Sequence, residues 1–368
     1  MDKCKTITLE LLRIALSDSP IEESSQLFEG CNWEKIVHYS AQQGITALVW
    51  DGLNRVIQEG KLSIENLPDR ATKLQWALAV ERLEKRYAKQ ASVIERLASI
   101  LDVNDIKTMI LKGYGLSLCY PKPSHRSCSD IDIWLYGKQK DGDDLLHKSL
   151  GITIDQGKHH HTVFYVDGVM VENHFDFLNL HAHRSSREIE GELLKRAEEH
   201  SDEIGIGNSV VYMPPVNLHA LFLLRHSASH FAAEKIVLRH LTDWAMFLKH
   251  NASNIDWVWL YDVCRTQNMD RFLDALNGYA VDYFDIDKSK LPNFTRRTNL
   301  EERILNDILQ PEFSERKPDK GLIRIILFKC RRWWANRWKH HLVYREGLLH
   351  SFVTQAWSHI LKPKAIKS

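Results

Sequence analysis

The sequence predicts an α+β fold, with a small mixed β-sheet between an N-terminal and a C-terminal helical region. Apolar residues recur at helical spacing near both ends of the chain, whereas the middle alternates polar with apolar residues and holds several turn formers. These patterns divide the 368 residues into a helical region at 1–100, a sheet core at 101–205, and a helical region with a basic, Trp-rich tail at 206–368.

Three helices are expected in the N-terminal region. Their apolar positions lie mostly three or four residues apart, as one buried face of an α-helix requires. They include Ile7, Leu11 and Ile14 in the first helix, Trp33, Ile36 and Val37 in the second, and Trp76, Val80, Leu83 and Tyr87 in the third. We expect this region to be a helical cap, or a wall on the substrate side of the core, without chemistry of its own.

The predicted core begins with a strand, a short helix and a second strand. Residues 107–113 form a short apolar run that ends in glycine, which suits a buried strand leading into a turn. A short helix over 114–120 is stopped by two prolines. Residues 130–135 begin with the alternation of a β-strand, and 143–150 suit another short helix.

A β-hairpin completes the predicted core. Residues 159–166 and 169–177 are rich in β-forming residues, and Asp167-Gly168 joins them as a turn pair in which glycine accepts positive φ. The charged residues 181–205 suit a helix followed by a loop.

Composition limits the classes of protein to consider. The formal net charge is +1, so no global field attracts nucleic acid or membranes. The six cysteines form no Cys-x-x-Cys pair, which favours a reduced, cytoplasmic location over a disulfide scaffold. No run of about 18 uncharged apolar residues occurs, so we expect no transmembrane span.

Three acidic side chains form the candidate catalytic and metal-binding cluster. Asp130 and Asp132 are two residues apart on a predicted strand, so both face one side of it while Ile131 faces the other. Neighbouring carboxylates repel each other unless a cation neutralises them, and these oxygen ligands suit Mg²⁺ or Mn²⁺. Glu172 completes the cluster if the second hairpin strand lies beside them. Taken alone, the Asp pair is weak evidence and better suits a charged edge strand.

Four residues are candidates for binding nucleotide phosphates. Lys112-Gly113 lies at a strand-to-helix turn, where backbone N–H groups can hold phosphate. Arg126 lies four residues before Asp130, in a proline-bounded loop that can reach the same place, and Ser129 directly precedes Asp130.

Histidines of the predicted hairpin are candidates for the substrate side of the site. His159 and His161 open the hairpin, and His174 shares a strand face with Glu172. We favour substrate contact or solvent exposure over a zinc site, because a consecutive histidine run on a strand cannot direct every ring at one ion.

A later helix supplies further candidates. His226 and His230 are four residues apart, a spacing that can bind zinc, but no third ligand is evident. With Arg239 they form a predicted acceptor-side wall. Arg239 and Asp243 are also four apart and equally suit a simple helical ion pair.

The C-terminal tail has two interpretations. Eight Lys or Arg and no acid lie between Lys320 and Arg345, together with Trp333, Trp334 and Trp338. This pattern suits weak contact with an anionic membrane surface or with nucleic acid. It equally suits a helix whose tryptophans pack on the body while its charges stay in water.

Several segments together carry a family resemblance. They are Leu111-Lys-Gly113, Tyr120-Pro121, Pro123, Arg126, Ser129-Asp-Ile-Asp-Ile133 and Val171-Glu-Asn-His174. They resemble the polymerase-β-type nucleotidyltransferase superfamily and, within it, an uncharacterised nucleotidyltransferase family found in many polysaccharide-producing bacteria. The flanking segments 32–44 and 238–244 are also similar to that family.

The resemblance implies a nucleotidyltransferase-like sheet and a reaction. A nucleoside monophosphate would pass from an NTP to a small or carbohydrate-like acceptor, with release of pyrophosphate. Asp130 and Asp132 would bind the cation, and Glu172 would help to deprotonate the acceptor. The family's usual serine or glycine after the first glycine is Tyr114 here. That departure favours the alternative, a catalytically weak nucleotide- or partner-binding protein that keeps the fold.

Overall fold

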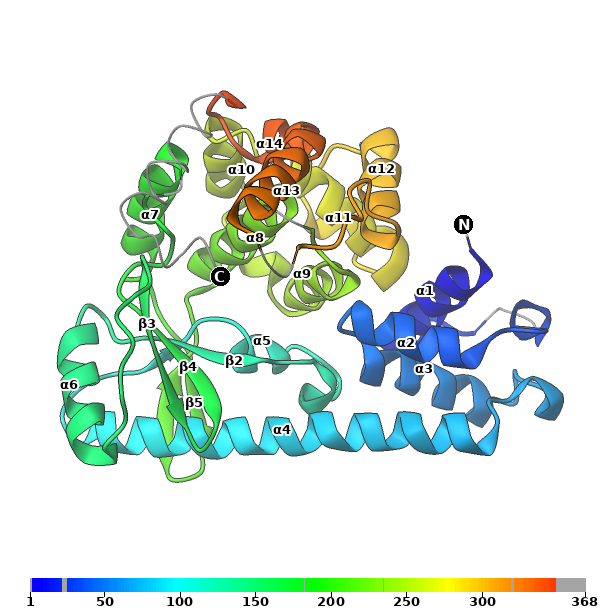
Figure 1. Ribbon diagram of the computed structural model, residues 1–368, viewed down its shortest axis with the longest axis horizontal. Coiled ribbons are helices and arrows are strands. Elements are labelled where there is room, and N and C mark those ends of the chain that lie inside the picture. Colours follow the sequence, from blue (N-terminus) through cyan, green and yellow to red (C-terminus); the bar gives the residue numbers. More distant parts are fainter. Residues whose placement is uncertain (1, 22–24, 182, 234, 319–320, 349–368) are drawn as a thin grey trace.

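The computed structural model describes residues 2–21, 25–181, 183–233, 235–318 and 321–348. A six-stranded mixed sheet lies on a long helix, with helices at the far end of that helix and above the sheet (Figure 1). The α+β class with helical flanks is therefore confirmed.

The three predicted N-terminal helices are present as α1 (Lys3–Leu16), α2 (Trp33–Gln42) and α4 (Arg70–Asp102). A fourth helix, α3 (Thr46–Gln58), was not predicted. Side chains before two of these helices accept hydrogen bonds from the first-turn backbone, Asn32 from the N–H of Lys35 and Asp69 from the N–H of Thr72. These caps satisfy donors that have no partner inside the helix and so fix where each helix begins.

The sheet has the strand order β3-β4-β2-β1-β6-β5. Its strands are β1 (Met109–Ile110), β2 (Asp130–Trp134), β3 (His161–Val166), β4 (Val169–His174), β5 (Glu203–Ile206) and β6 (Ser209–Tyr212). Strand β2 pairs parallel with β4 and antiparallel with β1, and β1 pairs parallel with β6. Two short helices lie between strands, α5 (Tyr114–Ser117) and α6 (Gln139–Leu150).

The sheet contains two hairpins, of which the sequence predicts one. Asp167 and Gly168 join β3 to β4 with φ values of 51° and 76°, as the Asp-Gly pair predicts. The β5–β6 hairpin, which turns at Gly207 with φ +56°, was not predicted. Strand β5 is only four residues long, so the alternation of the exposed Glu203 and Gly205 with Ile204 and the buried Ile206 gives too short a pattern to mark a strand within a charged segment. The predicted core boundary at residue 205 falls inside this hairpin, and the sheet continues to Tyr212.

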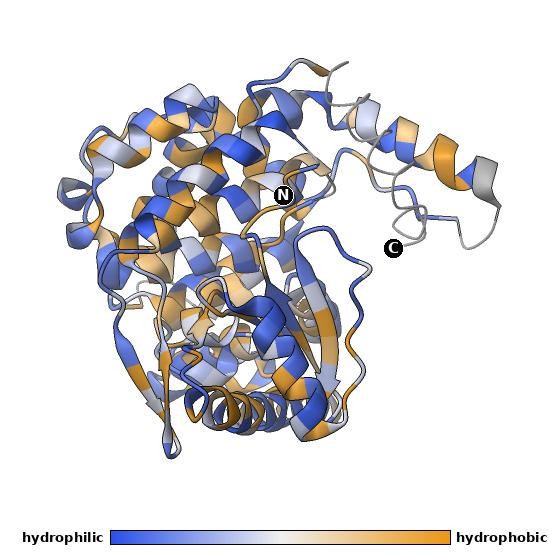
Figure 2. Cartoon of the chain, turned by 90° about the vertical axis from the view of Figure 1, so that its left-hand side faces the viewer, coloured by the Kyte–Doolittle hydropathy of each residue, from blue (hydrophilic) through white to orange (hydrophobic). Residues whose placement is uncertain are grey.

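Helix α4 belongs to two hydrophobic cores. Its N-terminal half places Trp76 among α1, α2 and α3, where the Trp76 ring lies 5.5 Å from that of Trp50. Its C-terminal half packs Leu97 under the sheet, against Ile131 and Ile133 of β2. Figure 2 shows hydrophobic and hydrophilic residues interspersed on the helices around the sheet, as expected where each helix buries only part of its surface.

The C-terminal helices lie on the side of the sheet away from α4 (Figure 1). They are α7 (Arg184–Arg196), α8 (Val216–Ala233), α9 (Leu238–Asn251), α10 (Trp257–Thr266), α11 (Asp270–Phe284), α12 (Thr298–Leu309), α13 (Leu322–Ala335) and α14 (Arg337–Val343). In the part of the chain that the structure describes, no helix is both long and apolar enough to cross a lipid bilayer.

The loop before β2 is anchored to the N-terminal region by one histidine. The buried His125 ring lies with Nδ1 2.6 Å from an Asp51 carboxylate oxygen and Nε2 2.9 Å from a Glu84 carboxylate oxygen. Burial alone would lower the pKa of His125, but these two hydrogen bonds raise it above 6.5. The His125 ring therefore joins this loop to α3 and α4.

We expect this anchor to make stability depend on pH. Because the folded-state pKa of His125 is raised, its contribution is fully present below about pH 6.5 and is lost as pH rises through the folded value. His125→Gln should lower the free energy of unfolding by about 1–3 kcal/mol near pH 6 and by less near pH 9. Denaturant unfolding at both values tests this, with the exposed His38→Gln as control. An equal loss at both values would contradict it.

Candidate active site

The parallel pairing of β2 with β4 brings three carboxylates together. In this register Asp132 lies opposite Glu172, and Asp130 shares their face of the sheet. Ile131 and Ile133 point the other way and are fully buried. Strand β4 thus lies beside the Asp130 strand, as the clustering of Glu172 with the aspartates requires.

Asp132 is the buried centre of this cluster. It has no exposed surface, and its Oδ1 lies 3.0 Å from Lys112 Nζ and 3.2 Å from His174 Nε2. Burial alone would raise the pKa of Asp132, but the Lys112 ammonium and His174 hold it well below its usual range. Burial and the Asp132 charge instead raise the pKa of Glu172. One carboxylate is therefore held ionised while its neighbour binds protons more readily.

The carboxylates open into a pocket of about 760 Å³ between the sheet and the C-terminal helices. One side of it carries the acidic cluster with Lys112, Gly113, Ser129 and His159. The other sides come from α8, α9, α13 and the segment after α14. They contribute Phe222, His226, His230, Arg239, His240, Asp243, Lys329, Arg332, Trp333 and Tyr344.

Three histidines of α8 and α9 line the same pocket as the carboxylates. The His226 ring centre lies 4.5 Å from that of His230 on the same helix and 6.5 Å from that of His240 on α9. Burial lowers the pKa of His226 well below 6.5, and that of His240 to about 3. Two neutral rings therefore line this wall at neutral pH. His240 was not predicted, because it comes close to His226 only when α9 folds against α8.

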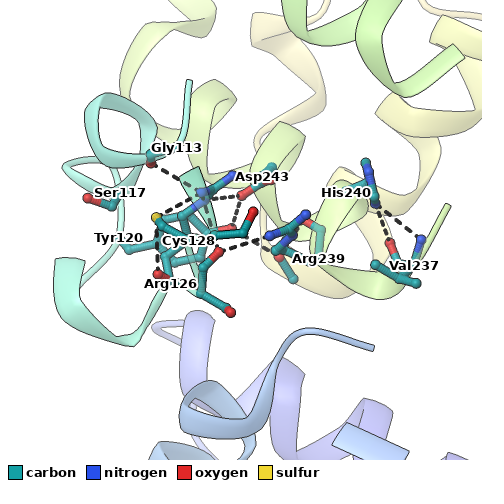
Figure 3. Close-up of polar contacts among 12 residues, drawn as sticks. Gly113, Ser117, Tyr120, Arg126, Cys128, Val237, Arg239, His240 and Asp243 are labelled. Carbon is teal, nitrogen blue, oxygen red and sulfur yellow. Dashed lines mark hydrogen bonds and ion pairs between the residues drawn. The ribbon is translucent and has the colours of Figure 1, made fainter. Parts of the chain in front are cut away.

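Arg126 is held by Asp243 rather than turned freely toward the pocket. Its Nε and one terminal nitrogen donate to Asp243 at 2.9 and 2.8 Å, and the other terminal nitrogen donates to the Gly113 carbonyl at 3.2 Å (Figure 3). A phosphate contact by Arg126, as predicted, would therefore compete with a buried two-hydrogen-bond ion pair.

Arg239 and Asp243 do not form the helical pair that their spacing allows. Asp243 accepts from Arg126 instead, and Arg239 donates to the carbonyl of Ser127 at 2.9 Å. Arg239 and Asp243 of α9 thus both contact the loop that leads into β2 (Figure 3). The spacing rule fails because buried partners from another element offer better geometry than a neighbour on the same helix.

The Lys112-Gly113 turn lies directly beneath the aspartates. Gly113 has φ +56°, and a Cβ at this position would meet the Asp130 carbonyl at 3.3 Å. Glycine therefore suits both the backbone conformation and the close approach. The neighbouring Ser129 hydroxyl donates to Asp130 at 2.8 Å.

The histidine run before β3 is arranged differently from the prediction. Strand β3 begins only at His161, so strand alternation does not constrain His159 and His160. His159 and His160 line the pocket. His161 lies behind it, with Nε2 3.7 Å from Glu172 Oε1. Ligand atoms of His160, His161 and His174 lie within 4.8 Å of one another. Strand alternation did not predict that these imidazoles would lie so close together.

The basic tail is divided between the pocket and the surface. Lys329, Arg332 and Trp333 of α13 line the pocket, while Trp334 is 60% exposed. Trp338 packs against the body, with its ring 5.5 Å from that of Phe231. The end of the predicted tail, residues 349–368, lies outside the described residues. Contact with a membrane surface or nucleic acid stays a prediction.

Comparison with known proteins places these residues in a family. Residues 29–285 match the sequence model of a family described as uncharacterised nucleotidyltransferases, which is more than half of the chain. The chain belongs to this nucleotidyltransferase family. The matched range includes the whole sheet and the helices α8 and α9. Neither the curated proteins nor the solved structures that were compared include a match.

The Arg126–Asp243 pair of this nucleotidyltransferase should be important for its stability. Asp243→Asn would leave a buried arginine without its counter-charge, so we expect a loss of about 3–5 kcal/mol in the free energy of unfolding. The double change Arg126→Met with Asp243→Leu should lose less than Asp243→Asn alone. Chemical denaturation measures both. Glu81→Gln, in the exposed Glu81–Lys85 pair, is the control and should resemble wild type. A double variant less stable than Asp243→Asn would contradict the pairing.

Proposed function

We propose that this nucleotidyltransferase moves a nucleoside monophosphate from an NTP to a hydroxyl of a small or carbohydrate-like acceptor. The observation that carries the proposal is the convergence of Asp130, Asp132 and Glu172 on one side of a pocket large enough for both substrates. In the reaction the acceptor oxygen bonds to the α-phosphorus, the bond from that phosphorus to the β-phosphate oxygen breaks, and pyrophosphate leaves.

The donor set fits a divalent cation, Mg²⁺ or Mn²⁺. Asp132 Oδ2 is buried and has no hydrogen-bond partner among the described residues, and the only ammonium paired with Asp132 there belongs to Lys112. Asp130, Asp132 and Glu172 would hold the cation. When bound, it would neutralise triphosphate charge and orient the reacting oxygens.

The chain's own groups supply the remaining steps. The raised pKa of Glu172 suits a group that takes the acceptor hydroxyl proton. Lys112 and the backbone at Gly113 lie where they can bind phosphate oxygens, and the hydroxyl of Ser129 is beside them. Arg126 acts indirectly in this proposal, because it holds the Gly113 carbonyl and thereby the turn.

We place the acceptor against α8 and α9. His226, His230 and Arg239 line the same pocket as the carboxylates, so an acceptor bound to them would have its hydroxyl within the pocket that holds the cluster. We also propose a cytoplasmic location, since the six cysteines are all unpaired, as in a reducing compartment.

The second candidate is a nucleotide- or partner-binding protein with weak catalysis. Two observations favour it. Tyr114 follows Gly113 where a serine would contact phosphate, and Lys112 already neutralises Asp132. Binding without transfer would leave nucleotide affinity intact while pyrophosphate release is absent.

The transfer reaction is tested by a panel of NTPs with Mg²⁺ or Mn²⁺, scored for pyrophosphate release and for label on any copurified acceptor. We expect Asp130→Asn with Asp132→Asn to abolish turnover, and Glu172→Gln to lower kcat by about 10²–10⁴-fold. Asp262→Asn, at an exposed acid of α10, is the matched control. Nucleotide binding without turnover in wild type would favour the second candidate.

The acceptor wall is tested separately. His226→Ala should raise the KM for the acceptor labelled in that panel by about fivefold, because it removes one hydrogen-bonding ring, and should leave the KM for NTP nearly unchanged. Steady-state kinetics with each substrate varied measures the two constants, with the exposed His200→Ala as control. An unchanged acceptor KM would remove His226 from the wall.

A further inference from the structure

We propose that the imidazole of His174 is a direct ligand of the cation at Asp132 and Glu172, and that this position therefore selects Mn²⁺ over Mg²⁺. The inference deepens the proposed function and rests on it, because it concerns the cation held at the same carboxylates.

The three side chains converge in a way that suits one ion. Ligand atoms of Asp132, Glu172 and His174 all lie within 4.8 Å of one another. His174 Nε2 is 3.2 Å from Asp132 Oδ1 and 3.8 Å from Glu172 Oε2. The Asp132 and His174 side chains are at least 98% buried, and Glu172 borders the pocket. An ion reaching this point from the pocket would meet two oxygens and one nitrogen.

The tautomer of His174 is set from its other side. Nδ1 lies 3.2 Å from the carbonyl oxygen of Asp176, which can only accept a hydrogen bond. Nδ1 therefore carries the proton, and in the neutral ring Nε2 presents a lone pair. A backbone carbonyl behind the ring is the usual device by which proteins orient a metal-binding histidine.

That orientation directs lone pairs at one another. The Nε2 of a neutral His174 faces an oxygen each of Asp132 and Glu172, and such atoms repel unless a cation lies between them. The cation is either a proton on His174 or a metal ion. Asp132 Oδ2 supplies an independent indication, since it is buried without a hydrogen-bond partner among the described residues.

A second nitrogen donor lies just behind the site. The His161 side chain is 9% exposed, and neither of its ring nitrogens has a hydrogen-bond partner in the described part of the chain. Its Nε2 is 3.7 Å from the Glu172 carboxylate. The surroundings of Glu172 are therefore rich in imidazole as well as carboxylate.

Mixed nitrogen and oxygen donors discriminate between the two candidate ions. Mg²⁺ requires near-ideal octahedral geometry and prefers oxygen ligands, so an imidazole in its first shell is unfavourable. Mn²⁺ accepts carboxylates and also imidazole, and first-row transition ions gain affinity from nitrogen donors. A site with two carboxylates and one imidazole should hence bind Mn²⁺ more tightly than a site of carboxylates alone.

The decisive measurement is electron paramagnetic resonance of Mn²⁺ added to the full chain. We expect bound Mn²⁺ in wild type to show hyperfine coupling to ¹⁴N in pulsed spectra, and Mg²⁺ to displace it only at a large excess. His174→Gln keeps a polar side chain but removes the nitrogen ligand. It should lose the coupling and weaken Mn²⁺ binding by about tenfold or more, with little change for Mg²⁺. His38→Gln is the control, with the same change at an exposed site.

The outcomes separate this inference from the proposed function. Mn²⁺ that binds to wild type without ¹⁴N coupling, is lost in Asp132→Asn and is displaced by equal Mg²⁺ would overturn the His174 ligand and leave nucleotidyl transfer standing. Coupled Mn²⁺ without nucleotide turnover would support the ligand and count against transfer. If His174→Gln fails to fold, His161→Gln assigns the coupling instead, because it should keep the ¹⁴N signal when His174 is the ligand and lose it when His161 is.

Discussion

The structure depends on the burial of negative charge where β2 runs parallel to β4. This pairing places the fully buried Asp132 opposite Glu172, and two carboxylates at such a place cannot both remain ionised without nearby positive charge. Within the core, Lys112 and His174 contact Asp132 and offset its negative charge. The pocket also gives a cation access to the same oxygens. The carboxylates of the site therefore carry more negative charge than the neighbouring side chains neutralise. Such an imbalance is typical of a site that binds a charged ligand.

A second buried ion pair, Arg126–Asp243, fixes the C-terminal helices against the sheet. Arg126 comes from the loop before β2 and Asp243 from α9, so their two hydrogen bonds join the sheet to the C-terminal helices. Arg239 binds the same loop through the Ser127 carbonyl. His125 of the same loop binds Asp51 of α3 and Glu84 of α4. This short segment thus contacts helices of both flanking regions, and it leads directly into the strand that carries Asp130 and Asp132.

Much of the local structure could be predicted from the sequence, because it depends on neighbouring residues. Alternation at Asp130 and Asp132 gave their common face, and Asp167-Gly168 gave the hairpin. The β5–β6 hairpin was missed because its two strands have four residues each and bury only Ile206 and Val211 fully, so the buried pattern is too short to mark them. The pairing of Arg126 with Asp243 and the approach of His240 to His226 join distant elements, and spacing along one helix pointed to the wrong partner for Asp243. The surroundings of Lys329 and Arg332 likewise follow from how α13 folds back, which composition alone does not encode.

The place of β1 in the sheet has a consequence for synthesis of the chain. This two-residue strand lies between β2 and β6, and its Met109 pairs with Tyr212 far along the sequence. While the ribosome is still extending the chain, β1 keeps an open edge until β6 has emerged. Such edges invite pairing with other nascent chains. A polypeptide halted before residue 209 would hold all three carboxylates and yet lack the strand that pairs with β1, which makes incomplete copies candidates for aggregation and rapid proteolysis.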